Sequence, residues 1–98
     1  MREHVSYPGR MQRPRSDASA HVGRLVRSAR TRQNLTRRTV ATRADLDISH
    51  LARIENGLGN PTLHVLIQLA SALGLRPEQF LEGLGAADLP SEASSTPA

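Results

Sequence analysis

The 98-residue sequence contains no cysteine, no lysine and no long apolar run. Without cysteine there is no disulfide framework, thiolate metal site or cysteine nucleophile, which suits a reducing compartment. The longest apolar stretches fall far short of the roughly 20 residues that a membrane-spanning helix needs, and the arginine-rich start lacks the apolar core of a secretory signal. We therefore expect one small domain, soluble and cytoplasmic, with no membrane partner.

Basic residues are concentrated in the first half of the chain. All 13 are arginines, and residues 1–53 hold 12 of them against four acidic residues, a formal charge of +8. Residues 54–98 hold one arginine against five acidic residues, a formal charge of −4. A positively charged half indicates a surface for a polyanion, with nucleic acid and membrane lipid as the usual candidates. A GC-rich genome would explain the missing lysine but not this asymmetry.

Apolar spacing predicts an all-α domain at residues 18–86. The first 17 residues combine arginine and proline with no apolar period, which predicts a flexible basic arm, and residues 87–98 predict a flexible tail. No alternating strand pattern occurs between them. Five helices are expected, at about 18–32, at 37–44, from 48 to the Asn56-Gly57 stop, at 63–73, and in a short last segment that starts at Pro77 and carries Phe80, Leu81 and Leu84.

Polar residues mark the helix ends. Asn34 suits the left-handed position that follows the first helix. Thr36, Asp47 and Thr62 stand where N-caps of the second, third and fourth helices belong. About three residues, 45–47, separate the second helix from the third, which is the length of a helix-turn-helix connection rather than of an antiparallel hairpin.

Four segments in order carry a family resemblance. They are Leu35-Thr36 with Val40-Ala41, then LARIENG at 51–57, NPTL at 60–63 and LASALGL at 69–75. From about residue 22 to 84 the chain therefore resembles the Cro and lambda-repressor-like helix-turn-helix proteins, also called the xenobiotic-response-element family. The resemblance implies a five-helix lambda-repressor-like domain that binds double-stranded DNA, with the third helix in the major groove as recognition helix. Asp45, where the family usually has glycine, departs from the pattern, as do Asp47 and Ile48.

The third helix has an inward and an outward side. Leu51 and Ile54, three residues apart, form the inward pair. The resemblance implies that this helix contacts base edges through the outward Ser49 and Arg53 and through Ile48 and His50 on the flanks. Among these, Arg53 alone can make a bidentate contact to guanine, while Ile48 can cover a thymine methyl group.

The resemblance also assigns roles to other polar residues, either as contacts to the DNA backbone or as contacts that stabilise the fold. Arg37 and Asn56 match family positions that grip sugar-phosphate, and a planar guanidinium suits an anionic oxygen. Additional backbone contacts are expected from Arg38, Arg43 and Asn60, with a solvated face as the alternative for the two arginines. In the family, an arginine late in the first helix pairs with the glutamate before the asparagine, so Arg30 and Glu55 are assigned to a structural ion pair.

These features predict a sequence-specific regulator that binds an inverted-repeat operator as a homodimer. A core of about 60 residues is marginal alone, and the surplus leucines Leu81 and Leu84 are expected to form the dimer contact. The alternative is an antitoxin or adaptor whose main partner is another protein, such as a toxin. No enzyme is expected, because no nucleophile and base are paired. The four histidines lack metal-ligand spacing, so neither metal nor cofactor is expected.

Overall fold

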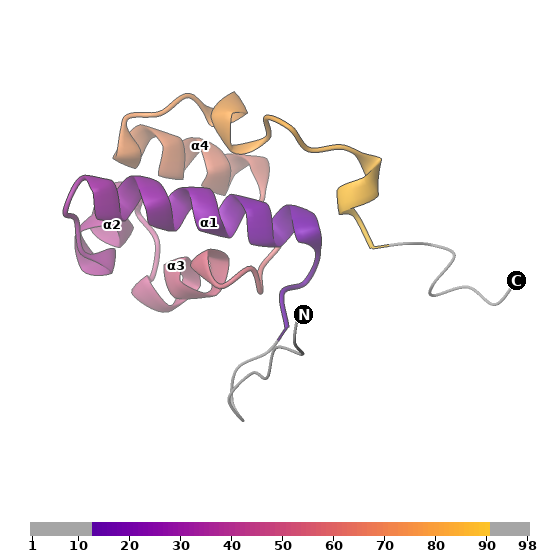
Figure 1. The fold of residues 1–98 in the computed structure, drawn as a ribbon. Helices are drawn as coiled ribbons and strands as arrows, with labels where there is room; N and C mark the ends of the chain where they lie inside the picture. Colours follow the sequence, from indigo (N-terminus) through magenta and orange to yellow (C-terminus); the bar gives the residue numbers. More distant parts are fainter. Residues whose placement is uncertain (1–12, 91–98) are drawn as a thin grey trace, which may run out of the picture.

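Residues 13–90 are described by the computed structural model, and they form four α-helices and two short 3₁₀ turns. The helices are α1 (Asp17–Arg32), α2 (Arg37–Ala44), α3 (Ile48–Glu55) and α4 (Leu63–Leu73), and the turns are η1 (Pro77–Phe80) and η2 (Ala86–Asp88). Within this range there is no strand, so the all-α prediction is confirmed. Figure 1 shows α1 crossing the molecule with α4 above it and α3 below it. Residues 1–12 of the predicted arm (1–17) and residues 91–98 of the predicted tail (87–98) lie outside the described residues, whereas Ser16 caps α1, Asp17 begins it, and Ala86–Asp88 form η2.

Helix starts and stops follow the polar residues read from the sequence, with one exception. The Thr36 hydroxyl accepts the N–H of Thr39 at 3.0 Å, and the Thr62 hydroxyl accepts the N–H of Val65 at 3.1 Å. Asn34 takes φ +58°, which confirms its left-handed position. Asp47 occupies the N-cap position of α3, but its side chain makes no capping hydrogen bond, so that predicted cap is wrong in its chemistry.

The predicted fifth helix is also wrong. Phe80, Leu81 and Leu84 have helical spacing, yet the chain makes only the four-residue turn η1. Gly83 takes φ +84°, a conformation that an α-helix does not contain, and it ends any helical path beyond this turn. The phenyl ring of Phe80 is fully buried, so packing of one side chain, rather than a helix, fixes this segment.

All four α-helices and η1 contribute to one apolar core. The largest fully buried side chains are Phe80, Leu51, Ile54, Leu69, Val26 and Val40. Burying each of these contributes about 1.5 to 3 kcal/mol relative to leaving it exposed. The inward pair predicted for α3, Leu51 and Ile54, is confirmed, because both side chains are buried. The core therefore fixes which side of α3 faces outward.

Gly23 allows α1 and α3 to approach closely. A Cβ atom at this position would meet the carbonyl oxygen of Ile54 and would lie 2.7 Å from the carbonyl oxygen of Glu55. Both carbonyls are backbone atoms at the end of α3, which cannot move aside without shifting that helix. The absence of a Cβ atom at Gly23 therefore helps to set the position of α3.

Replacing Gly23 by alanine tests this close approach. Alanine is the better helix former by about 1 kcal/mol, but the clash should dominate and lower the free energy of unfolding by about 1 to 3 kcal/mol. Urea unfolding followed by circular dichroism measures it. Gly85→Ala is the matched control, because a Cβ there meets open space, and its effect should stay within about 0.5 kcal/mol. Equal stability of the two variants would contradict the close approach.

Candidate nucleic-acid interface

A sharp turn sets α3 at an angle to α2. Asp45 ends α2 in the left-handed region with φ +59°, the place where the resembled family usually has glycine. The N–H of Leu46 then donates to the Ala41 carbonyl at 2.9 Å, and the Leu46 side chain packs against the core. Aspartate tolerates this backbone less well than glycine but better than most residues. The turn therefore has helix-turn-helix geometry although Asp45 stands where the family usually has glycine.

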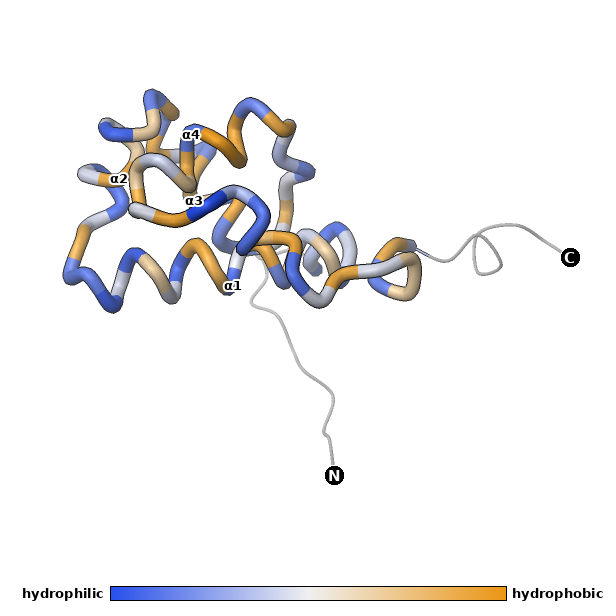
Figure 2. The backbone as a smooth tube through the Cα atoms, turned by 90° about the horizontal axis from the view of Figure 1, so that it is seen from above, coloured by the Kyte–Doolittle hydropathy of each residue, from blue (hydrophilic) through white to orange (hydrophobic). Residues whose placement is uncertain are grey.

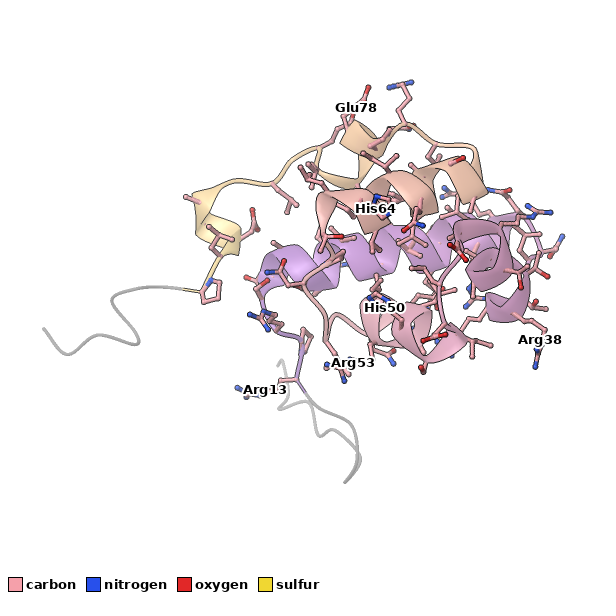
Figure 3. The ribbon with its side chains drawn as sticks, turned by 180° about the vertical axis from the view of Figure 1, so that it is seen from behind. Arg13, Arg38, His50, Arg53, His64 and Glu78 are labelled. Atoms are coloured by element: carbon pink, nitrogen blue, oxygen red, sulfur yellow. The ribbon has the colours of Figure 1, made fainter. Side chains whose placement is uncertain are left out.

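The outward side of α3 is exposed to solvent. The four predicted base-contacting residues are all exposed: Ile48, Ser49, His50 and Arg53. Ile48 leaves 46% of its surface accessible although it is apolar. In Figure 3 the Arg53 side chain points away from the body of the molecule. The exposed side thus offers one cation, two hydrogen-bonding groups and one apolar side chain.

A buried carboxylate lies at the end of α3. The side chain of Glu55 has 0% exposure, and arginines from two other helices bind it. Arg30 of α1 makes a bidentate contact, with Nε at 2.6 Å from Oε2 and Nη2 at 2.9 Å from Oε1. Arg37 of α2 donates from Nε to Oε1 at 2.9 Å. One carboxylate therefore ties α1, α2 and α3 together.

The electrostatics of this cluster favour its charged form. Burial raises the pKa of Glu55, but the hydrogen bonds from Arg30 and Arg37 outweigh burial and leave the pKa below its ordinary value. The hydrogen bond to Glu55 in turn raises the pKa of Arg30. The Nη1 group of Arg30 also donates to the Leu35 carbonyl at 3.0 Å, which joins the cluster to the loop between α1 and α2.

Two members of the cluster were not assigned to it from the sequence. Arg37, predicted to contact the DNA backbone, has its Nε on Glu55 and retains 35% side-chain exposure. Arg27 places its Nε 3.5 Å from Glu55 and donates from Nη2 to the Asn56 Oδ1 at 2.9 Å. The three-residue spacing of Arg27 and Arg30 puts both on one face of α1, so the sequence could have indicated that Arg27 also reaches Glu55. No local pattern reveals the partner of Arg37, which is 18 residues away.

The other residues predicted at the DNA backbone are exposed. Arg38 and Arg43 lie on α2, and Asn56 and Asn60 lie at the end of α3 and in the loop after it. Figure 3 shows Arg38 and Arg53 extending from the same side of the molecule, with Glu78 on the opposite side. Two exposed arginines therefore lie on the side that displays α3, and the exposed Asp45 and Asp47 lie in the turn that leads into this helix.

The two leucines predicted at a dimer contact lie in the segment after η1. Figure 2 shows this segment leaving the helical part of the molecule, with hydrophobic residues along it. Leu81 is 46% exposed, whereas Leu84 is partly buried against the core. Together with Val22, Leu66 and Leu89, they line a groove of about 280 Å³.

Neither a metal site nor a membrane span is found in residues 13–90. Histidine, aspartate and glutamate side chains of this range form no group of three or more that could hold a metal ion. No helix in the same range is both long enough and apolar enough to cross a bilayer.

Known proteins share this arrangement. A family model described as Helix-turn-helix matches residues 26–80. The uncharacterized HTH-type transcriptional regulator y4dL of Sinorhizobium fredii is 36% identical over 55 residues, which make up 56% of this chain and 28% of that protein. The chain thus spans little more than a quarter of that relative's length.

Solved structures of similar fold extend the comparison. The restriction-modification controller protein C.AhdI from Aeromonas hydrophila has a TM-score of 0.62 and 31% identity, over 63% of this chain and 94% of that chain. The restriction-modification controller protein C.Esp1396I, solved as a tetramer in complex with its natural 35-base-pair operator, has a TM-score of 0.61 over 66% of this chain and 86% of that chain. At 22% identity, this second likeness concerns the fold alone.

Breaking the Glu55 cluster should destabilise the fold. Glu55→Ala leaves arginines partly buried without their anion, and we expect a loss of about 3 kcal/mol in the free energy of unfolding. Arg30→Ala should cost less, because Arg37 still binds the carboxylate. Arg38→Ala is the control on an exposed position and should change stability by less than about 0.5 kcal/mol. Thermal unfolding of the three variants gives the ranking, and unchanged melting of Glu55→Ala would contradict it.

Acid should reveal the same cluster. Because the pKa of Glu55 is lower in the folded protein than its ordinary value of about 4.5, its contribution is present above that pH and is lost as pH falls through the lowered pKa. Glu55→Gln does not titrate there, so its melting temperature should fall less than that of the wild type between about pH 5 and pH 3. If the melting temperatures of the two proteins fall equally as the pH is lowered, Glu55 is not held in its charged form.

Proposed function

The chain belongs to the Helix-turn-helix family of DNA-binding transcription regulators, and we propose that it binds a specific DNA sequence through the exposed side of α3. The family resemblance read from the sequence is thereby confirmed, and the family is not a class of enzymes. In this proposal the N-terminal half of α3 enters the major groove and α2 lies across the sugar-phosphate backbone.

The observation that carries the proposal is the fixed outward side of α3. Core packing of Leu51 and Ile54 and the cluster around Glu55 hold the helix from its inner side and from its end. The side chains of Ser49 and Arg53 are left exposed on a helix whose orientation they do not determine. A rigid helix with free polar side chains is what base recognition needs, because a misplaced donor loses the hydrogen bond to its base.

Backbone contacts are assigned to the polar residues around α3. Arg38 and Arg43 are exposed on α2, so their guanidinium groups can reach phosphate oxygens. Arg37 uses its Nε for Glu55, so we assign only its terminal N–H groups to phosphate. Asn56 accepts from Arg27 through Oδ1 and keeps its amide N–H groups for the DNA backbone. We place Asn60, exposed in the next loop, at the margin of this surface.

We also propose that the protein acts as a homodimer on an inverted repeat. Exposed apolar side chains at Leu81 and Leu89 flank a groove, and a second copy related by two-fold symmetry would cover them. C.Esp1396I, which shares this fold, was solved as a tetramer on its operator and is a precedent for binding by several copies. Two recognition helices would then enter successive major grooves, roughly 34 to 36 Å apart.

Two arginine substitutions separate base reading from backbone binding. Arg53→Ala should weaken binding to the preferred site, selected from a random DNA pool, by about 1 to 3 kcal/mol and relax the preference at one base pair. Arg38→Ala should weaken binding to all sequences alike, because phosphates carry no sequence information. Fluorescence anisotropy on the selected site and on single-base variants measures both. Equal and sequence-independent losses from the two substitutions would contradict the role of Arg53.

Sedimentation tests the homodimer. On a palindromic selected site the wild type should bind as two copies, whereas Leu81→Asp places a charge in the proposed contact and should leave single copies bound to half-sites. Ile67→Asp is the control, since Ile67 is an exposed apolar residue on α4 outside the groove. A wild type that stays monomeric on the palindrome, or a selected site without a repeat, would refute the dimer.

A further inference from the structure

The residues just before α1 are docked on the end of the recognition helix. The backbone N–H of Arg15 donates to the Gly57 carbonyl at 2.7 Å. Pro14 lies against the same glycine, because a Cβ atom on Gly57 would stand 3.1 Å from the Pro14 Cβ. Gly57 is buried and has φ +75°, so it forms the turn that follows α3. The chain therefore passes the C-terminal end of α3 before it enters α1.

Two anchors restrict this segment. The Ser16 hydroxyl caps α1 by accepting the N–H of Ser19 at 3.0 Å, and the Arg15 hydrogen bond holds the preceding peptide to Gly57. Pro14 separates Arg13 from these two anchors, and its ring fixes its own φ angle. The path of the chain at Arg13 is thus set by contacts with α3 rather than by α1 alone.

Arg13 is exposed on the side of the molecule that displays α3. Figure 3 shows the side chains of Arg13 and Arg53 pointing away from the helices on the same side, opposite to Glu78. Placing a further cation on the side that already displays Arg38 and Arg53 costs like-charge repulsion. A polyanion bound across this face would remove that cost.

We infer that Arg13 is an additional contact of this protein to a DNA phosphate, at the backbone bordering the groove that α3 enters. The inference rests on the proposed function. If the N-terminal half of α3 meets base edges, its C-terminal end lies toward the flanking sugar-phosphate backbone. The docked segment brings a guanidinium to that end, where its planar fork fits two phosphate oxygens. Arg13 thereby extends the DNA surface beyond the helix-turn-helix unit.

The test compares two arginine substitutions that change net charge equally. Arg13→Gln removes the proposed contact, and Arg76→Gln removes an exposed arginine that bonds Glu78 on the opposite side. Binding of the full chain is measured on the selected site and on a mixed-sequence duplex of the same length, roughly 20 base pairs or about two helical turns, at several salt concentrations. Arg13→Gln should bind about three- to tenfold more weakly and lower the salt slope by about one, while Arg76→Gln should match the wild type.

A second variant tests whether docking positions Arg13. Pro14→Gly frees the segment, so it should weaken binding by itself, and Arg13→Gln should then add less than it does in the wild type. The same Arg13→Gln effect in both backgrounds would overturn the positioning by Gly57 and Pro14.

The outcomes separate this inference from the proposed function. Arg13→Gln binding as tightly as Arg76→Gln, or a loss confined to one of the two duplexes, would overturn the phosphate contact, while tighter wild-type binding to the selected site than to the mixed-sequence duplex upholds the proposed function. A wild type that binds neither duplex at low salt would overturn both.

Discussion

The buried carboxylate of Glu55 is the interaction on which the arrangement of the first three helices depends. A carboxylate with no exposed side-chain surface is unfavourable unless charged partners and hydrogen bonds compensate for the lost water. Arg30 supplies two hydrogen bonds from α1, and Arg37 supplies one from α2. Because Glu55 is the last residue of α3, satisfying its charge also fixes the end of that helix. The buried ion pairs of Glu55 therefore help to fix the orientation of the outward side of α3.

The same cluster leaves positive charge at the surface. One carboxylate engages Arg27, Arg30 and Arg37, so the group as a whole is cationic. Arg27 and Arg37 remain partly exposed while bound to Glu55, which holds their guanidinium groups in place instead of leaving them on free side chains. Ordering cations before an anion arrives reduces the entropy lost on binding. In the proposed DNA complex, Arg37 would therefore serve both the fold, through Nε, and a phosphate, through its terminal N–H groups.

Local patterns predicted most of the fold, and contacts distant in sequence account for what they missed. The apolar spacing of α1 to α4 and the caps at Thr36 and Thr62 are properties of short segments, so they are visible in the sequence. The fifth helix failed because Gly83 overrides the apolar spacing around it. The bond from Arg37 to Glu55 and the docking of Arg15 on Gly57 join residues far apart in the chain, which one sequence cannot reveal.

The most direct test of the central claim, that the outward side of α3 meets DNA, is an amide chemical-shift map. Nitrogen-15-labelled protein is titrated with its selected DNA site, and perturbed amides are placed on the structure. The account predicts that the largest shifts fall on the first turns of α2 and α3, on Arg53 and on Arg13 and Arg15. Shifts concentrated instead on α4 and the segment after η1, with α3 unaffected, would contradict it.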